Sequence, residues 1–193
     1  MKYVSFLVVI LATLISCNKK ENKSESLNSE IPKIETKDTL NVKETDFQKF
    51  VDHFSESSLP HKDSTNFDNV EKLADLSERQ ISQLKLKELF PDIHSFKINN
   101  HFNLSDNFES LSVTYFKGEM EVSTELINYT KEGKIIDHIE ISYDEIAESA
   151  FRKESLINKN QIIVYSENSF EEPVKTEKEK IFINSDGHFK IKK

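Results

Sequence analysis

Four carboxylates and one histidine lie close together in the sequence and have side chains that can bind a cation or transfer a proton: Glu121, Glu125, His138, Glu140 and Asp144. Carboxylate oxygens are the ligands that Ca²⁺ prefers, although the ion takes about six to eight oxygens. Clustered acids also attract a basic protein surface, and a histidine beside a carboxylate can act in acid–base catalysis. The residues therefore raise three hypotheses: a Ca²⁺ site, a face for a basic partner, and an acid–base pair of His138 with Glu140.

The alternation of apolar and polar residues predicts that one β-hairpin positions these side chains. Its strands are expected at residues 121–130 and 134–143, on either side of the turn sequence TKEGK. Because the buried face sets the register of a hairpin, a loop of even length is favoured, which pairs Leu126 with Ile139. A three-residue loop would pair Leu126 with His138 instead.

The favoured register places like charges opposite each other. Glu121 faces Asp144 and Glu125 faces Glu140, while His138 shares their face. Like charges directly opposite are destabilising in a sheet. Either the four carboxylates have a function, or they spread apart on a solvated face of an acid-rich chain.

The only cysteine of the chain, Cys17, directly follows an apolar N-terminus. The uncharged run of residues 3–15 is shorter than the roughly 20 residues of a membrane-spanning helix, and it matches the apolar core of a secretory signal. The stretch Leu14-Ile15-Ser16-Cys17 resembles the lipobox of bacterial lipoproteins. The resemblance implies cleavage before Cys17, lipidation of its sulfur, acylation of the new amino terminus and a place in the cell envelope. Asn18, which follows the cysteine, favours the outer membrane.

The sequence divides the chain into three parts. Residues 1–16 are the expected signal peptide, residues 17–45 are the lipidated cysteine with a flexible charged tether, and residues 46–193 form one domain. The tether consists mainly of Lys, Glu, Asn and Ser, so it cannot bury enough apolar surface to fold. The net charge of −8 argues against nucleic acid as a partner.

Two helices are predicted at the start of the domain. Two capping-box pairs mark their first turns: Thr45 with Gln48, and Ser77 with Gln80. The first helix is expected to end near Glu56, and the second to continue to Pro91, because apolar residues recur at helical spacing over both segments.

Strands are predicted after the second helix, where the apolar period becomes alternating. A short helix is expected at residues 144–153, a mobile charged loop at residues 166–180, and a final hairpin with Gly187 in its turn. Helices followed by strands predict an α+β fold, with two N-terminal helices packed on a mostly antiparallel β-sheet of meander hairpins.

The sequence favours a binding protein over an enzyme. The chain has three glycines, all in turn-like settings, so it lacks a glycine-rich phosphate loop. We expect a non-catalytic binding or structural lipoprotein, held at the membrane by its lipid and in contact with a protein or envelope partner, with no cofactor apart from the Ca²⁺ considered above. The alternatives are an inhibitor or immunity-type lipoprotein that neutralises a basic protein, and a metal-dependent enzyme.

Overall fold

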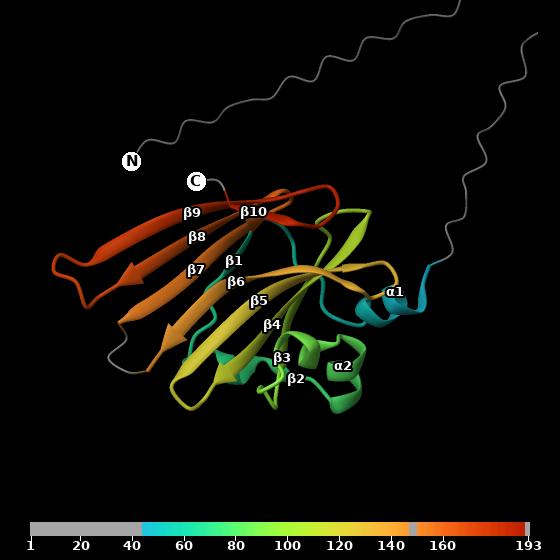
Figure 1. The fold of residues 1–193 in the computed structure, drawn as a ribbon, viewed down its shortest axis with the longest axis horizontal. Helices are drawn as coiled ribbons and strands as arrows, with labels where there is room; N and C mark the ends of the chain where they lie inside the picture. Colours follow the sequence, from blue (N-terminus) through green and yellow to red (C-terminus); the bar gives the residue numbers. More distant parts are fainter. Residues whose placement is uncertain (1–43, 147–149, 192–193) are drawn as a thin grey trace, which may run out of the picture. The chain divides into compact units, whose positions relative to one another are not determined.

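An antiparallel β-sheet of ten strands is the main element of the part of the chain that the computed structural model describes, residues 44–146 and 150–191. The sheet order is β10-β9-β8-β7-β6-β5-β4-β3-β2, and β1 pairs with β7 (Figure 1). The strands are β1 (His61–Asp63), β2 (Ala74–Asp75), β3 (Lys97–Phe102), β4 (Phe108–Lys117), β5 (Glu121–Thr130), β6 (Ile135–Glu145), β7 (Phe151–Asn158), β8 (Gln161–Asn168), β9 (Lys175–Ile183) and β10 (Phe189–Ile191). From β3 onward each strand pairs with the next one in the chain, so the sheet is a meander.

The predicted α+β fold is wrong, because the described helices are too short to form a layer. They are α1 (Asp46–Val51), α2 (Glu78–Gln83), α3 (Leu86–Leu89) and one 3-10 turn (Val70–Lys72). Among the described residues, the two N-terminal helices expected to form a layer across the sheet are only these short segments. The protein is mostly antiparallel β-sheet with small helical segments.

Both predicted capping boxes are confirmed, whereas both predicted helix lengths are wrong. The side chains of Thr45 and Ser77 each accept a hydrogen bond from the backbone three residues on. The first helix nevertheless ends at Val51, and the second breaks at Lys85, which has a φ of 54°. A capping box helps to start a helix, but the length of a short helix depends mainly on its tertiary packing.

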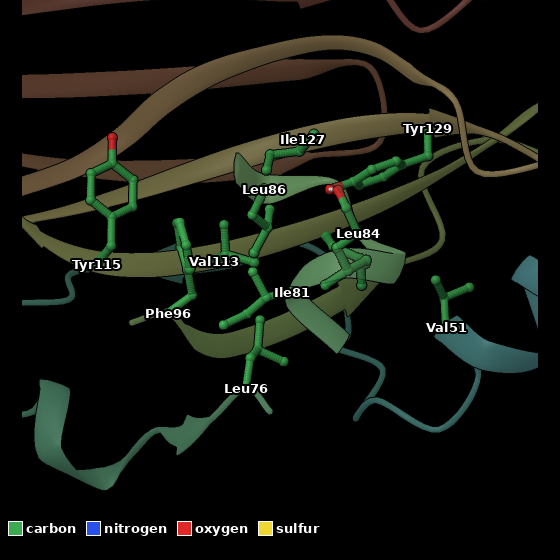
Figure 2. Close-up of a cluster of buried hydrophobic side chains, with 11 residues drawn as sticks. Val51, Leu76, Ile81, Leu84, Leu86, Phe96, Val113, Tyr115, Ile127 and Tyr129 are labelled. Atoms are coloured by element: carbon green, nitrogen blue, oxygen red, sulfur yellow. Dashed lines mark hydrogen bonds between the residues drawn. The ribbon is translucent and has the colours of Figure 1, made fainter. Parts of the chain in front are cut away.

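The central strands are buried on both faces, by two apolar clusters. One cluster includes Ile127 and Tyr129 of β5 together with Leu84, and it joins the sheet to the helical segments. In Figure 2 the Tyr129 side chain points toward Leu84, whose carbonyl accepts a hydrogen bond from the tyrosine hydroxyl at 3.0 Å. The other cluster contains Leu126 of β5 and Ile181 of β9, so it joins the two halves of the sheet.

The sheet bends back on itself, which brings its C-terminal edge onto its centre. The Asn128 amide of β5 donates a hydrogen bond to the Gly187 carbonyl at 2.7 Å. In a flat sheet β5 and β10 would lie about 24 Å apart, at roughly 4.8 Å per strand. The bend occurs where β6 and β7 separate, because these strands pair at only two positions and β1 pairs with residues 155–157 of β7.

The central hairpin has the predicted register only in its middle. Leu126 pairs with Ile139, as predicted, but the predicted even length of the loop is wrong, because the loop has three residues and ends at Gly133, whose φ is 78°. A β-bulge between Asn128 and Tyr129 restores the apolar pairing that the loop would otherwise break. A second bulge, between Thr124 and Glu125, shifts the far end of the hairpin by one residue.

Two further predictions are wrong and one is confirmed. The helix expected at residues 144–153 is instead the end of β6 and the start of β7, with residues 147–149 outside the described part. The loop expected at residues 166–180 is instead a hairpin formed by β8 and β9. The final hairpin forms as predicted around Gly187, which has a φ of 90°. Across the described ranges, no helix combines the length and apolar character that crossing a bilayer requires.

Candidate functional site

Glu125 lies beneath the helical segments and forms an ion pair with His138. Its side chain is almost fully buried, at 8% exposure, and it accepts from the His138 Nδ1 atom at 3.1 Å and from the Tyr115 hydroxyl at 3.4 Å. Phe90 packs edge-on against the His138 ring, with 5.6 Å between the centroids. His138 therefore pairs with Glu125, whereas the sequence pattern predicted an acid–base pair with Glu140.

Glu140 is neutralised by cations from the strands on either side. Its carboxylate accepts from Lys153 of β7 at 2.6 Å, from the Ser123 hydroxyl at 2.7 Å and from Lys117 of β4 at 3.1 Å. Burial alone would raise the pKa of Glu140, but the hydrogen bonds from Lys153 and Ser123 lower it. Glu125 and Glu140 lie directly opposite each other, as predicted, and each carboxylate has its own basic partner.

Asp144 does not join this group, because the second bulge turns it to the other face of the sheet. It pairs with Val122, and its carboxylate accepts a hydrogen bond from the Phe67 N–H at 3.2 Å. Glu121 remains on the Glu125 face, opposite Glu145 in place of Asp144. The structure therefore brings Glu121, Glu125, His138 and Glu140 to one face and separates Asp144 from them.

The carboxylate oxygens of Glu125 and Glu140 are already engaged by the protein itself. Lys117, Lys153 and His138 occupy the positions that a cation would take beside Glu125 and Glu140. Within residues 44–146 and 150–191, no group of three or more His, Cys, Asp or Glu side chains is arranged to hold a metal ion. The arrangement on this face is one of ion pairs within the sheet.

We expect the contribution of the His138–Glu125 pair to the stability of the fold to decrease as the pH rises. The hydrogen bond to Glu125 raises the pKa of His138 above its ordinary value of 6.5, against the effect of burial. A group whose pKa is raised by folding stabilises the protein fully below its unfolded pKa, and this stabilisation disappears as the pH passes the folded pKa. We expect the stability difference between the wild type and His138→Gln to be largest near pH 5.5 and smallest near pH 9, around the usual histidine pKa of about 6.5. Urea unfolding of both proteins at the two pH values measures it, and an equal difference at both would contradict the prediction.

A second buried ion cluster was missed by the sequence analysis. Glu109 of β4 accepts from His101 of β3 at 3.0 Å and from Lys131 at 2.5 Å, and only 10% of its side chain is exposed. Burial would raise the pKa of Glu109, but the hydrogen bonds from His101 and Lys131 outweigh burial and lower it to about 2. One signal could have revealed the cluster, because Glu109 alternates in phase with Leu111 and Val113 and so lies on an apolar face.

The outer part of the β8–β9 hairpin differs from the rest of the sheet because none of its side chains reaches the core. We call residues 165–180 the ribbon; none of its side chains is buried, and every residue from 169 to 180 is exposed. It projects beyond β7 at the left of Figure 1. Phe170 and Val174 at its turn are 58% and 50% exposed, and the Phe170 ring lies 5.9 Å from that of Phe151. A hollow of about 310 Å³ lies against the ribbon, lined in part by Arg152 and Lys178.

Comparison with known proteins finds no match for this chain among protein-family models, curated proteins or solved structures.

Proposed function

We propose that this chain is a non-catalytic binding lipoprotein of the bacterial cell envelope, which contacts a partner protein through the ribbon. The proposal rests on one observation: both faces of the ribbon are exposed. Ordering each residue of a chain costs about 1–2 kcal/mol of backbone entropy. Core residues offset this cost by burial, whereas the side chains of residues 169–180 all remain exposed. An ordered segment outside the core is best explained by a role at the surface.

The composition of the ribbon also supports a contact surface. Aromatic residues are enriched where proteins meet, and Phe170 of the ribbon is 58% exposed and lies in ring contact with Phe151 of β7, which is 44% exposed. Charged residues surround them along β9. An exposed aromatic group with a charged rim resembles the anatomy of a protein interface.

The anchor of the proposed module is Cys17, which lies outside the described residues. Its lipidation and the outer-membrane location rest on the likeness of residues 14–17 to a lipobox. Two or more acyl chains give stable membrane attachment. The residues between Cys17 and α1 would then act as the tether that presents the domain.

Capture of a partner from native envelope extract tests the proposal. We expect the full-length protein, extracted in detergent, to retain one partner in stoichiometric amount, and Phe170→Ser to lose it. The melting temperature should stay unchanged, because the Phe170 side chain is exposed. Ile191→Ser is the matched control, since Ile191 is 48% exposed and lies outside the ribbon. Equal capture by both variants, or no partner in repeated trials, would refute the proposal.

A further inference from the structure

One edge of β9 has no neighbouring strand among the described residues. From Lys175 to Lys180 the strand pairs with β8 on one side only, because β10 reaches no further than Ile181. The opposite end of the sheet is covered, since the N–H of Ser57 donates to the His101 carbonyl of β3 at 2.9 Å. An unpaired edge offers its backbone groups to an incoming strand.

The hydrogen bonds of the sheet identify which residues face this open edge. The Ile183 N–H donates to the Asn160 carbonyl at 3.1 Å, on the β8 side. Successive residues of a strand direct their backbone groups to opposite sides, and the pairing of β8 with β9 has no register shift. Odd-numbered residues of β9 therefore bond to β8. The backbone N–H and C=O groups directed to the open edge belong to Thr176, Lys178 and Lys180.

The charges of β9 are sorted by face. Lys178 and Lys180 alternate with Glu177 and Glu179, so one face of the strand is basic and the other acidic. Glu177 pairs with Lys175 at 2.9 Å, and the Lys178 ammonium lies over the Tyr165 ring, 5.3 Å from its centroid. Within the described part of the chain, Lys178, Glu179 and Lys180 form no ion pair. An added strand would meet these charges directly.

A second copy of the chain does not fit this edge. Subunits of a symmetric dimer would pair their β9 strands antiparallel, and directly opposite side chains would share a face. In the registers that pair residues 177–180 with one another, Lys178 would face another Lys178 or Lys180, and Glu177 would face another Glu177 or Glu179. Like charges in these positions are destabilising, so the edge favours a different chain.

We infer that β9 binds its partner by strand addition, and that the added segment alternates acidic and basic residues. Its acidic side chains face Lys178 and Lys180, and its basic side chains face Glu177 and Glu179. The backbone of Thr176, Lys178 and Lys180 supplies the hydrogen bonds, and the charges select the sequence. This inference rests on the proposed function and specifies the chemistry of the partner.

Peptide binding tests the charge pattern. The probe is a fluorescent peptide of alternating lysine and glutamate, about eight residues long, titrated into the full-length protein at low salt. The control peptide has the same composition in two blocks. We expect the alternating peptide to bind at least about tenfold more tightly, a difference of about 1.4 kcal/mol. The double variant Glu177→Lys/Glu179→Lys should remove this preference. Equal binding of the two peptides would overturn the inference.

A proline at the open edge tests the backbone contact. Lys178→Pro removes an outward N–H and leaves the bonds to β8, so it should abolish binding of the alternating peptide. Lys178→Val is the matched control, because it removes the same charge and keeps the N–H. If Lys178→Pro unfolds the ribbon, Thr176→Pro against Thr176→Val repeats the comparison at an uncharged position. Equal binding within the matched pair would exclude strand addition.

The same variants separate this inference from the proposed function. If the envelope partner is lost with Phe170→Ser but retained by Lys178→Pro, the ribbon is a binding surface and strand addition is wrong. If both variants lose the partner while Lys178→Val keeps it, both proposals are supported. If neither variant loses it, both are refuted.

Discussion

Replacing Glu109 by glutamine is expected to lower the free energy of unfolding by about 2–4 kcal/mol at neutral pH, since removing one partner of a buried ion pair leaves an uncompensated charge. Glu109 is the common acceptor of His101 and Lys131, and Gln48 also donates to it at 3.4 Å. Without the carboxylate, Lys131 loses its ion pair at a site where its side chain is 25% exposed. The cluster joins α1, β3, β4 and the turn between β5 and β6, so loss of the carboxylate affects several elements at once.

The effect of Glu109 should depend on pH in a defined direction. Its pKa falls from 4.5 to about 2 on folding. A group whose pKa is lowered by folding stabilises the protein fully above its unfolded pKa and loses this contribution as the pH falls through its folded pKa. The wild type and Glu109→Gln should therefore differ most above pH 4.5 and converge near pH 2.

Guanidinium unfolding of both proteins across this range is the measurement. Glu132→Gln is the control, because Glu132 is exposed in the neighbouring turn and its loss should change stability little. A Glu109→Gln protein as stable as the control at neutral pH would show that the cluster does not hold the fold together.

Replacing Gly133 by alanine is the second change with a large expected effect. Gly133 has a φ of 78°, and a Cβ atom added there would lie 2.5 Å from the Phe47 ring. The left-handed conformation costs alanine about 1–2 kcal/mol. Phe47 packs against Tyr129, with 5.3 Å between the ring centroids, and displacing a partly buried phenylalanine costs about 1–2 kcal/mol more. We expect a total loss of about 2–4 kcal/mol.

Gly118→Ala separates the two contributions. Gly118 has a φ of 71°, close to that of Gly133, but a Cβ atom there meets nothing within 4 Å. This control should lose only the backbone contribution, so the difference between the two variants in urea unfolding reports the clash with Phe47. If both variants lose the same stability, Phe47 does not fix α1 to the sheet.

Local signals in the sequence were sufficient for features that depend on residues close together in the chain. The capping boxes at Thr45 and Ser77 form, and Gly187 makes the predicted turn. The pairing of Leu126 with Ile139 is also confirmed, because a one-residue shift would turn apolar side chains away from the core.

Local signals did not predict two features, one in the β5–β6 hairpin and one in the ribbon. The second bulge moves Asp144 off the Glu125 face, and a bulge has no local mark in this sequence. The strand at residues 175–180 reads KTEKEK, which carries no apolar period because neither face is buried. Its strand conformation comes from pairing with β8 along its whole length.

The sequence by itself therefore determined the likeness of residues 14–17 to a lipobox, the starts of α1 and α2, the turn at Gly187 and the centre of the β5–β6 hairpin. The tertiary structure decided the fold class, the partners of the buried charges and the position of the ribbon. The physical reason is the range of the forces involved, since caps and turns act over a few residues, whereas burial joins distant segments. Glu109 and Lys131 are separated by 22 residues along the chain and meet only in the folded sheet.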